Sequence, residues 1–247
     1  MPAERYFINT DFLPHEFKEL SGSEFHHLIH VMRSKKGDAI ELINGRGALV
    51  QATIKEIARD KATLHIHEID QAPPSPCRLI LAQAFAKQNR LDFILEKGTE
   101  LGVDEFWLFP GHHSAKKECY PSQLERAQSV TIAAIKQSGR LYLPSLLLKP
   151  SIEKWNKSSL PTLFFGDLSL LAPMLGDSLK EISSHSFPLT FVTGPEGGFS
   201  EQEVNLLRSL GALGVRLHDN ILRTETASLM ALSLLSHAIA SLQNSLT

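Results

Sequence analysis

The sequence has little of several features that define common protein classes. Two cysteines among 247 residues, Cys77 and Cys119, are too few for a disulfide framework or a cysteine-rich zinc site. No run of 18 apolar residues occurs and the N-terminus has no signal pattern, so we expect a soluble, uncleaved, cytoplasmic protein without a membrane partner. Neither Gly-x-Gly-x-x-Gly nor a P-loop ending in Gly-Lys-Ser/Thr is present, which disfavours the common dinucleotide and nucleoside triphosphate sites.

An excess of basic residues is also missing. The formal net charge is −2 and the isoelectric point is near 6.6, so bulk attraction would not hold this chain to nucleic acid. Any RNA binding must therefore use local basic patches. The residues that we choose as RNA contacts are Arg5, Arg33, Lys35 and Arg140. A solvated charged surface is an equally good interpretation of each basic cluster.

Histidines are present in pairs with regular spacing. His26 and His30 lie four residues apart in a predicted helix, which is a spacing of metal ligands, but no Glu or Cys completes a set. We therefore assign no metal to the protein. His65 and His67 alternate along a predicted strand, and this alternation places both on its solvent face.

A proline-rich segment, residues 71–76, predicts a boundary between two domains because its three prolines bar regular structure and stiffen the connection. Before it, a short helix is predicted over Glu24–Met32. Strand patterns occupy residues 39–43, 48–57 and 62–69. Residues 1–72 are thus predicted to form a small β-barrel, and residues 73–247 to form a second domain.

Strand and helix patterns alternate after this boundary. The predicted strands are residues 79–83, 105–109, 163–165 and 189–192, and the predicted helices are residues 91–101 and a segment opened by a capping box from Ser122 to Glu125. Such alternation is typical of an α/β fold in which helices cover both faces of a parallel sheet.

A glycine-rich loop follows the last predicted strand of this series. It has the sequence Gly194-Pro-Glu-Gly-Gly-Phe-Ser200, and Ser200 with Glu203 forms a capping box for a following helix. Glycines in a loop permit backbone angles closed to other residues and let a ligand approach the main chain. They can also be structural turn residues only, and the spacing alone names no substrate.

A charged triplet lies about 25 residues further on. Residues 214–218 have a strand pattern, and a final helix is predicted to begin at Ile221, with Arg223, Thr224 and Glu225 in its first turn. Its apolar stripe from Ala227 to Leu242 indicates a buried face. A charged triplet between two apolar runs suits a functional site better than a core.

Taken together, Gly194-Pro-Glu-Gly-Gly-Phe-Ser200 and Leu222-Arg-Thr-Glu-Thr-Ala227 resemble the paired motifs of the SPOUT superfamily of knotted methyltransferases. Within it, the sequence is most similar to the uridine-N3 methyltransferases of small-subunit ribosomal RNA. The likeness extends to Glu96–Val103, Ala133–Arg140, Arg5-Tyr-Phe7 and His30-Val-Met-Arg33, and so covers nearly the whole chain.

The resemblance implies a fold, a cofactor and partners. The expected fold is a C-terminal parallel-sheet α/β domain with a trefoil knot, preceded by a PUA-like RNA-binding β-barrel. The expected cofactor is S-adenosyl-L-methionine, and the expected partners are 16S rRNA within the 30S subunit and a second copy of the chain. The implied cofactor-binding residues are Gly166, Gly194, Glu196, Gly197, Gly198, Leu217, Ile221, Leu222, Arg223 and Thr226.

The implied reaction is methyl transfer to N3 of a specific uridine. We hypothesise that Arg223 stabilises negative charge on the uracil carbonyl oxygens, while Glu225 or Glu196 orients Arg223 or helps to remove the N3 proton. Three positions depart from the family pattern, namely Lys136, His113 and His218. Two alternatives stay open: a methyltransferase of the same superfamily acting on transfer RNA or on ribose 2′-O, and a ribosome-assembly protein that binds RNA without catalysis.

Overall fold

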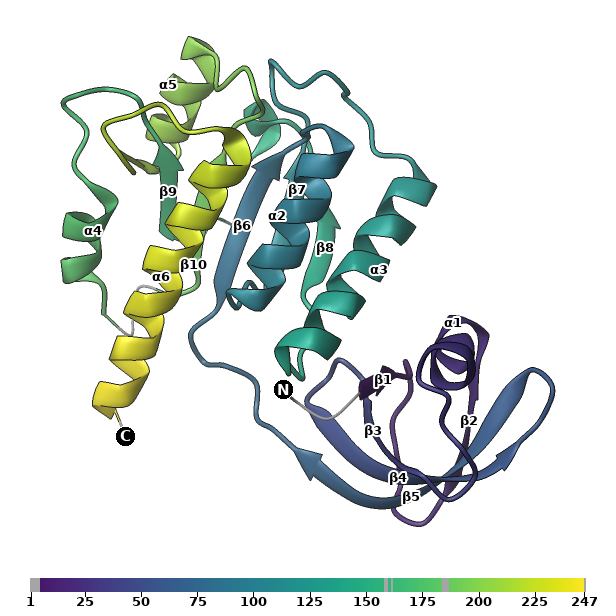
Figure 1. The fold of residues 1–247 in the computed structure, drawn as a ribbon. Coiled ribbons are helices and arrows are strands. Elements are labelled where there is room, and N and C mark those ends of the chain that lie inside the picture. Colours follow the sequence, from purple (N-terminus) through teal and green to yellow (C-terminus); the bar gives the residue numbers. More distant parts are fainter. Residues whose placement is uncertain (1–4, 158–159, 161, 184–186, 247) are drawn as a thin grey trace. The chain divides into compact units, whose positions relative to one another are not determined.

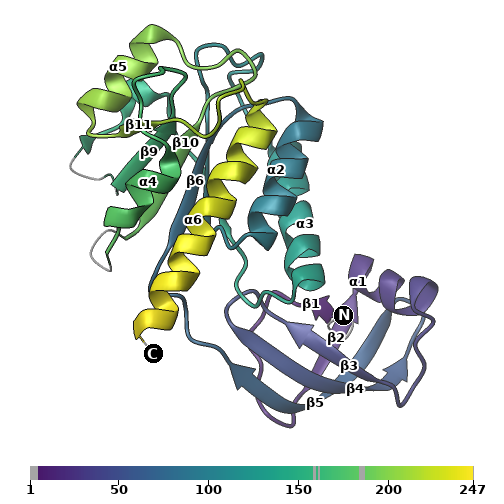
Figure 2. The ribbon, with the colours of Figure 1, turned by 60° about the vertical axis from the view of Figure 1, so that its left-hand side comes forward.

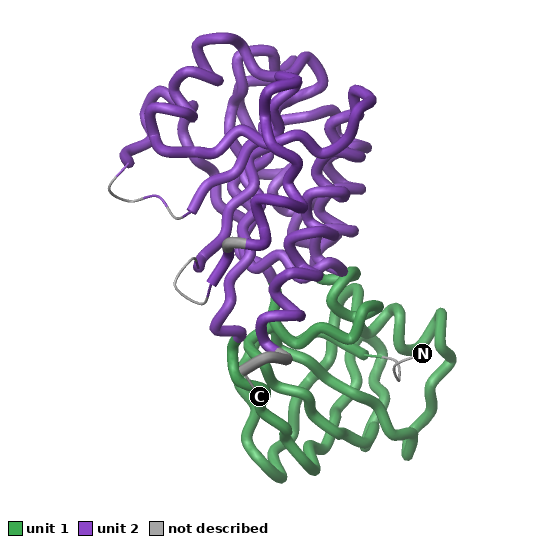
Figure 3. Tube along the Cα trace, turned by 90° about the vertical axis from the view of Figure 1, so that its left-hand side faces the viewer, with its two compact units in different colours: residues 1–74, 132–143 green, residues 75–131, 144–247 purple. Residues whose placement is uncertain are grey.

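A computed structural model of the protein describes residues 5–157, 160, 162–183 and 187–246 (Figure 1, Figure 2). The chain divides into two compact units (Figure 3). The first comprises residues 1–74 with 132–143, and the second comprises residues 75–131 with 144–247. The sequence led us to expect a single division, at residues 72 and 73, and did not assign residues 132–143 to the N-terminal unit.

The N-terminal unit contains a curled, mixed sheet of five strands in the order β1-β3-β4-β5-β2 (Figure 2). These strands are β1 (Arg5–Phe7), β2 (Phe17–Ser21), β3 (Ala39–Ile43), β4 (Ala48–Ile57) and β5 (Lys61–Gln71). Helix α1 (Gly22–His26) continues into the π-helical turn η1 (His27–Val31), which confirms the helix expected over this segment. Alternate residues of β4 and β5, such as Ile54 and Leu64, are buried in one apolar core.

The segment 132–143 packs within this N-terminal unit through polar and apolar contacts. Lys136 Nζ lies 2.8 Å from a carboxylate oxygen of Glu24, and Arg5 Nη1 donates to the main-chain oxygen of Gly139 at 2.7 Å. The segment includes the C-terminal half of helix α3 (Pro121–Ser138). Long-range pairs of this kind carry no local sequence signal, which is why a linear inspection did not find them.

The second unit is built on a parallel sheet of six strands in the order β11-β9-β10-β6-β7-β8. The strands are β6 (Leu79–Ala84), β7 (Glu105–Phe109), β8 (Ser145–Leu148), β9 (Thr162–Gly166), β10 (Leu189–Thr193) and β11 (Leu213–Val215). The central strands are buried throughout, since every residue of β6 and β10 is buried. This burial on both faces is what parallel sheets require.

Helices cover both faces of this sheet, as predicted. Leu79 and Leu81 of β6 join a core with helices α2 (Gln88–Glu100) and α6 (Thr224–Leu246). Ile80 of β6 joins a second core with Leu207 of helix α5 (Glu201–Ser209). The remaining short helices are η2 (Ile152–Lys154), α4 (Leu175–Ser178) and η4 (Leu179–Glu181). Figure 1 shows α2 and α6 side by side in front of β6.

Helix α6 is rich in apolar residues. Over Thr224–Gln243 it is long and apolar enough to cross a membrane by composition alone, with a mean hydropathy of 1.2, and 28% of its most apolar window is buried. It packs against α2, β6 and β10. Its apolar residues therefore serve, at least on one side, as part of the core of this unit.

Two predicted helix starts and one strand end were wrong. Helix α3 begins at Pro121 rather than after a Ser122 cap, as suits proline in the first turn of a helix. Strand β11 ends at Val215 and α6 begins at Thr224, so Arg223 precedes the last helix. The pairing of β11 with β9 ends at Val215, and the main chain of Arg216 is hydrogen-bonded to Pro173 and Leu175 instead.

Candidate active site

Three loops meet at the carboxyl edge of the second unit's sheet. They follow β9, β10 and β11, which are parallel, and β9 lies between the other two. Ligand sites of open α/β sheets form at this edge. The glycine-rich loop and the charged triplet come together there, because Thr224 Oγ1 donates to the main-chain oxygen of Gly194 at 2.7 Å.

A buried polar network lies beneath these loops. Gln83 Nε2, in strand β6, donates to the main-chain oxygen of Gly194 at 3.3 Å and to Thr224 Oγ1 at 3.2 Å. Ser228 Oγ donates to Gln83 Oε1 at 2.7 Å. Each of these side chains is buried and hydrogen-bonded, so the network fixes the loop and the start of α6 together. We did not single out Gln83 from the sequence, although a polar residue in a fully apolar strand is a usable signal.

The glycine-rich loop is itself closely packed. A Cβ on Gly194 would lie 3.2 Å from the carbonyl carbon of Gly198, and a Cβ on Gly197 would lie 2.8 Å from His113 Cβ. Gly198 has a φ of +71°, in the left-handed region that favours glycine. His113 Nδ1 lies 3.1 Å from the main-chain oxygen of Gly198. His113, which departs from the family pattern, thus contacts this loop at Gly197 and Gly198 and supports its conformation.

The capping box predicted for the next helix is confirmed. Ser200 Oγ accepts from the main-chain nitrogen of Glu203, while Glu203 Oε2 accepts from the main-chain nitrogen of Ser200 at 2.8 Å. The other carboxylate oxygen, Oε1, accepts from the main-chain nitrogen of His112 at 2.8 Å. One buried carboxylate therefore starts α5 and holds the neighbouring loop in place.

Two carboxylates of the predicted site share one guanidinium. Arg90 Nη1, in α2, lies 3.6 Å from Glu196 Oε1 and 3.7 Å from Glu225 Oε2. Glu196 Oε1 also accepts from the main-chain nitrogen of Lys87 at 2.9 Å. Glu225 Oε2 is buried without a hydrogen bond among the described residues. Arg90 therefore lies between these carboxylates, where we had expected Arg223. No feature of the sequence singled out Arg90.

Arg223 and its neighbours differ strongly in exposure. Arg223 and Thr226 are exposed, and the main-chain oxygen of Arg223 accepts from the nitrogen of Ala227 at 2.8 Å. Ile221 is 81% exposed, whereas Leu217 is buried and Leu222 is half-buried against the core. Of these three predicted cofactor contacts, Leu217 and Leu222 thus lie against the core, whereas Ile221 is directed to solvent.

The loops offer a cofactor both open space and unpaired main-chain groups. A Cβ on Gly166 would meet only Phe191 Cζ, at 3.9 Å, so the space beside Gly166 is open. Among the residues that the structure describes, none is hydrogen-bonded to the main chain of Leu217, Ile221 or Leu222. Unpaired main-chain groups at a buried residue require a partner, and an adenine edge supplies matching donors and acceptors. The residues present therefore fit the adenosyl cofactor.

The basic residues chosen as RNA contacts differ in their surroundings. Arg33 and Lys35 are exposed on the N-terminal unit, and Arg140 is half-buried in segment 132–143. The guanidinium of Arg5 is largely enclosed, because it pairs with Glu41 at 2.8 Å and bonds to Gly139. Of the other family-atypical residues, Lys136 pairs with Glu24 as described above, and His218 Nδ1 accepts from the main-chain nitrogen of Asn220 at 3.0 Å.

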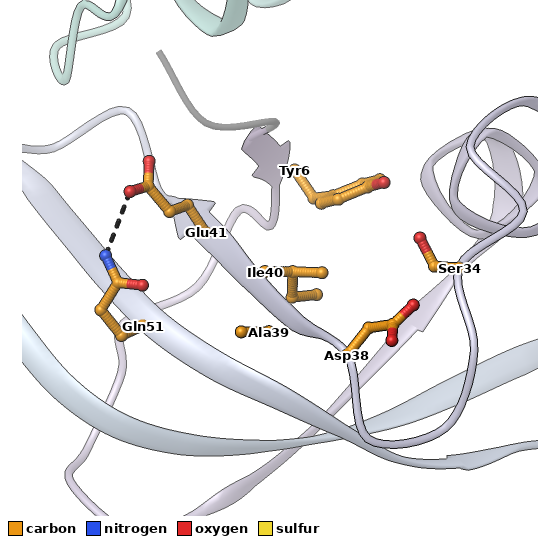
Figure 4. Close-up of a pocket in the computed structure, with 7 residues that line it drawn as sticks. All are labelled: Tyr6, Ser34, Asp38, Ala39, Ile40, Glu41 and Gln51. Carbon is orange, nitrogen blue, oxygen red and sulfur yellow. Dashed lines mark hydrogen bonds between the residues drawn. The ribbon is translucent and has the colours of Figure 1, made fainter.

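A cavity of about 430 Å³ lies within the N-terminal unit (Figure 4). Its lining residues are Tyr6, Ser34, Asp38, Ala39, Ile40, Glu41 and Gln51. Gln51 Nε2 donates to Glu41 Oε1 at 3.1 Å across one side of it. Because two carboxylates line it, this cavity is poorly suited to phosphate groups.

The fold and the site define the class of the protein. It is an α/β protein with a second, curled β unit and a candidate ligand site in the loops at the carboxyl edge of its parallel sheet. The profile of the RNA methyltransferase domain family matches residues 73–236, and that of the RNA methyltransferase PUA domain matches residues 20–66. The chain belongs to this family of RNA methyltransferases.

Similar proteins cover nearly the whole chain. The ribosomal RNA small subunit methyltransferase E of Bacillus subtilis is 29% identical over 95% of this chain and 96% of its own length. Its counterpart from Synechocystis is 32% identical over 87% of this chain and 71% of its own. The crystal structure of the Neisseria gonorrhoeae enzyme of this name, bound to S-adenosyl methionine, has a TM-score of 0.81 and 28% identity and covers 98% of each chain.

Proposed function

We propose that the protein transfers a methyl group from S-adenosyl-L-methionine to N3 of a specific uridine in the 16S rRNA of the small ribosomal subunit. The observation that carries this proposal is the bond between Thr224 and Gly194, which brings the charged triplet beside the glycine-rich loop. The nearly full-length similarity to ribosomal RNA small subunit methyltransferases E supports the same substrate.

The bound cofactor would supply a methyl group already activated on a sulfonium, so the protein mainly provides alignment. Leu217 and Leu222 would contact the adenine ring, and the main chain of residues 217–222 would hydrogen-bond its edge. Gly166 and Gly198 leave open space for the remaining parts, since a Cβ there would meet almost nothing. The other proposed contacts are Gly194, Glu196, Gly197, Ile221, Arg223 and Thr226.

Uracil N3 carries a proton near neutral pH that must leave before or during the attack. Arg223 is exposed and would donate to a uracil carbonyl oxygen, where negative charge develops. Glu225 or Glu196 would receive the N3 proton, and both lie within one ion-pair cluster at Arg90. Glu225 Oε2, buried and without a hydrogen bond among the described residues, has the capacity to accept one.

N3 lies on the Watson–Crick edge, so the target base must be unpaired when it reacts. Arg33, Lys35 and Arg140 would contact RNA phosphates, while Arg5 would hold the main chain next to Arg140 through Gly139. A second copy of the chain would cover α6, whose apolar surface is only partly buried. Assembled 30S subunits in the cytoplasm would be the substrate, because the chain has no net positive charge with which to hold naked RNA.

The decisive experiment is transfer from labelled S-adenosyl-L-methionine to small subunits that lack this modification, followed by separation of the nucleosides. Label in 3-methyluridine is expected. Label in another nucleoside, in transfer RNA or in ribose would move the substrate within the superfamily. Cofactor binding without any transfer would favour the non-catalytic assembly protein.

A variant of Arg223 tests the catalytic assignment. Arg223→Ala should lower kcat by about a hundredfold and cofactor affinity far less, because the guanidinium would act mainly on charge that develops only in the transition state. Arg126→Ala, which removes an exposed arginine of α3, is the matched control and should behave as the wild type. Unchanged turnover in Arg223→Ala would refute the role of Arg223.

A further inference from the structure

Four rings gather on the outer face of the N-terminal sheet. The ring centroids of Phe17 and His65 are 5.0 Å apart, those of His15 and His65 are 6.4 Å apart, and those of His65 and His67 are 4.7 Å apart. We name His15, Phe17, His65 and His67 the ring face. None of these residues belongs to the candidate active site.

Strand register explains why the rings meet. Phe17 of β2 lies opposite His65 of β5, and His65 lies opposite Thr53 of β4. Their neighbours Leu64 and Ile66 are buried on the other side of the sheet, so the rings face outward. His67 Nε2 lies 2.7 Å from Thr53 Oγ1, which fixes this ring against the sheet.

The ring face is accessible and serves no evident structural purpose. Phe17 is 62% exposed, and its neighbour Leu13 is 67% exposed. The core of this unit lies on the opposite face of the sheet and includes none of the four rings. His15 is also exposed, whereas His65 and His67 are half-buried, and His65 Nδ1 is a buried atom without a hydrogen-bond partner among the described residues. Exposed rings gathered on one face of a sheet are typical of a contact surface.

The charges near the ring face favour a polyanion with aromatic groups. Lys55 acts electrostatically on His65 and has no ion pair in the part of the chain that the structure describes. The nearby acids Glu16 and Glu19 are already paired, with Lys18 at 3.1 Å and with Lys61 at 2.5 Å. An unpaired lysine beside exposed rings is the combination by which proteins hold single-stranded nucleic acid.

The protonation state of the ring face is compatible with stacking on bases. Partial burial lowers the pKa of His65 below its ordinary value of 6.5, and electrostatic interactions with His67, Lys55 and His15 lower it further. His65 is therefore neutral near pH 7, and its flat ring remains available for stacking.

We propose that the ring face stacks unpaired nucleotides of ribosomal RNA, with Phe17 and His65 as the stacking rings and Lys55 as a phosphate contact. This inference rests on the proposed function, since it assigns a second RNA contact to the same enzyme. The ring face lies on β2, β4 and β5 of the unit that contains the matched PUA domain (Figure 2). Bases stack on exposed aromatic rings irrespective of sequence, so this surface would supply affinity and leave selection of the uridine to the active site.

The test measures binding of the full-length protein to transcribed 16S rRNA and to a short unpaired oligoribonucleotide. Phe17→Ala should weaken both by about fivefold or more, because a base stacked on a ring contributes about 1 to 3 kcal/mol. Phe17→Trp should retain affinity, whereas Phe17→Leu, which keeps apolar bulk without a ring, should lose it. Tyr120→Ala removes a 57% exposed ring from the other unit and should bind as the wild type.

Salt dependence separates the lysine from the rings. Lys55→Ala should reduce the slope of log affinity against log salt by about one, while Phe17→Ala should leave that slope unchanged. An unchanged slope in Lys55→Ala would refute the phosphate contact.

Three outcomes separate this inference from the proposed function. If Phe17→Ala binds RNA with wild-type affinity, the stacking role of the ring face is refuted. Formation of 3-methyluridine by the wild type would still support the proposed function. If Phe17→Ala binds RNA more weakly but the wild type forms no 3-methyluridine, the stacking role of the ring face is supported and the proposed uridine-N3 activity is refuted. Loss of affinity for subunits without loss for transcribed RNA would identify a ribosomal protein as the partner and overturn the RNA contact. Thermal unfolding checks that Phe17→Ala is folded.

Discussion

Arg90 illustrates, at the scale of a residue, how one helix controls two loops. It lies between Glu196 of the glycine-rich loop and Glu225 of α6, which would otherwise face each other as like charges. We expect Arg90→Ala to lower kcat/KM by about tenfold or more, because loss of the cation costs about 1 to 2 kcal/mol and leaves the two carboxylates facing each other as like charges. Methyl transfer under subsaturating substrate measures this effect.

The control for Arg90 lies on the same helix. Asp92→Ala removes a pair with Arg126, which lies at 2.8 Å and is 62% exposed, and a hydrogen bond from Gln88 Nε2 at 2.7 Å. Such an exposed pair contributes about 0 to 1 kcal/mol. Asp92→Ala should therefore leave kcat/KM nearly unchanged, and Arg90→Lys should recover part of the loss. Equal effects of Arg90→Ala and Asp92→Ala on kcat/KM would mean that the loss comes from disturbance of the helix and not from the charge cluster.

Glu41 gives the N-terminal unit a pH dependence. Burial raises its pKa, but hydrogen bonds from Arg5 and Gln51, with the charge of Arg5, outweigh burial and hold the pKa below its ordinary value of 4.5. The carboxyl of Glu41 therefore binds protons more readily in the unfolded chain than in the folded protein. Ionised Glu41 stabilises the fold fully above pH 4.5, and this contribution is lost as pH falls through the folded-state pKa. We expect Glu41→Gln to reduce the free energy of unfolding near neutral pH, and this difference from the wild type to shrink in acid. Urea unfolding at several pH values measures it, and a constant difference would exclude the ionised pair as the cause.

At the scale of elements, the end of β9 provides a selective test of the cofactor site. Gly166→Ala adds a methyl group that meets only Phe191 Cζ at 3.9 Å, so the fold should tolerate it. The same methyl group would occupy the space proposed for the cofactor. We therefore expect unchanged thermal stability and about tenfold weaker binding of S-adenosyl-L-methionine by calorimetry. Gly176→Ala, in α4 with nothing within 4 Å of its Cβ, should change neither quantity adversely. Full affinity in Gly166→Ala would place the cofactor elsewhere.

Elements with strong local signals were predicted from the sequence, and those defined by distant partners were not. The strand predicted over residues 189–192, rich in β-branched and aromatic residues, and the Ser200 capping box are confirmed because each depends on neighbouring residues. Strands β1, β2 and β8 were missed; β1 has three residues, and β2 and β8 are mostly exposed, so none shows a clear pattern. The convergence of Gly194 and Thr224 was expected, but Arg90 lies in an ordinary amphipathic helix and only the fold brings it to Glu225. The trefoil knot stays a prediction, because no periodicity encodes a chain crossing.

At the scale of the whole molecule, the apolar surface of α6 bears on how many copies of the chain make an active enzyme. The helix has a mean hydropathy of 1.2 over Thr224–Gln243, yet only 28% of its most apolar window is buried. A second copy of the chain would bury the remainder, as proposed above, and we expect the protein to sediment at about twice its monomer mass of 27.4 kDa. Ser233 is exposed on α6 and its hydroxyl donates to the main-chain oxygen of Leu229, a local bond of the helix, so Ser233→Glu should fold normally.

A carboxylate at position 233 would be desolvated without a partner inside a dimer interface, at a cost of several kcal/mol, so Ser233→Glu should sediment as a monomer. Ser129→Glu is the matched control, because Ser129 is an exposed serine of α3 with the same bond to the preceding helical turn. It should leave the sedimentation unchanged. If Ser233→Glu is monomeric and transfers no methyl group, the second copy completes the site; if it is monomeric and fully active, each copy works alone. Wild-type protein that sediments as a monomer would refute the dimer and leave the apolar side of α6 to another partner.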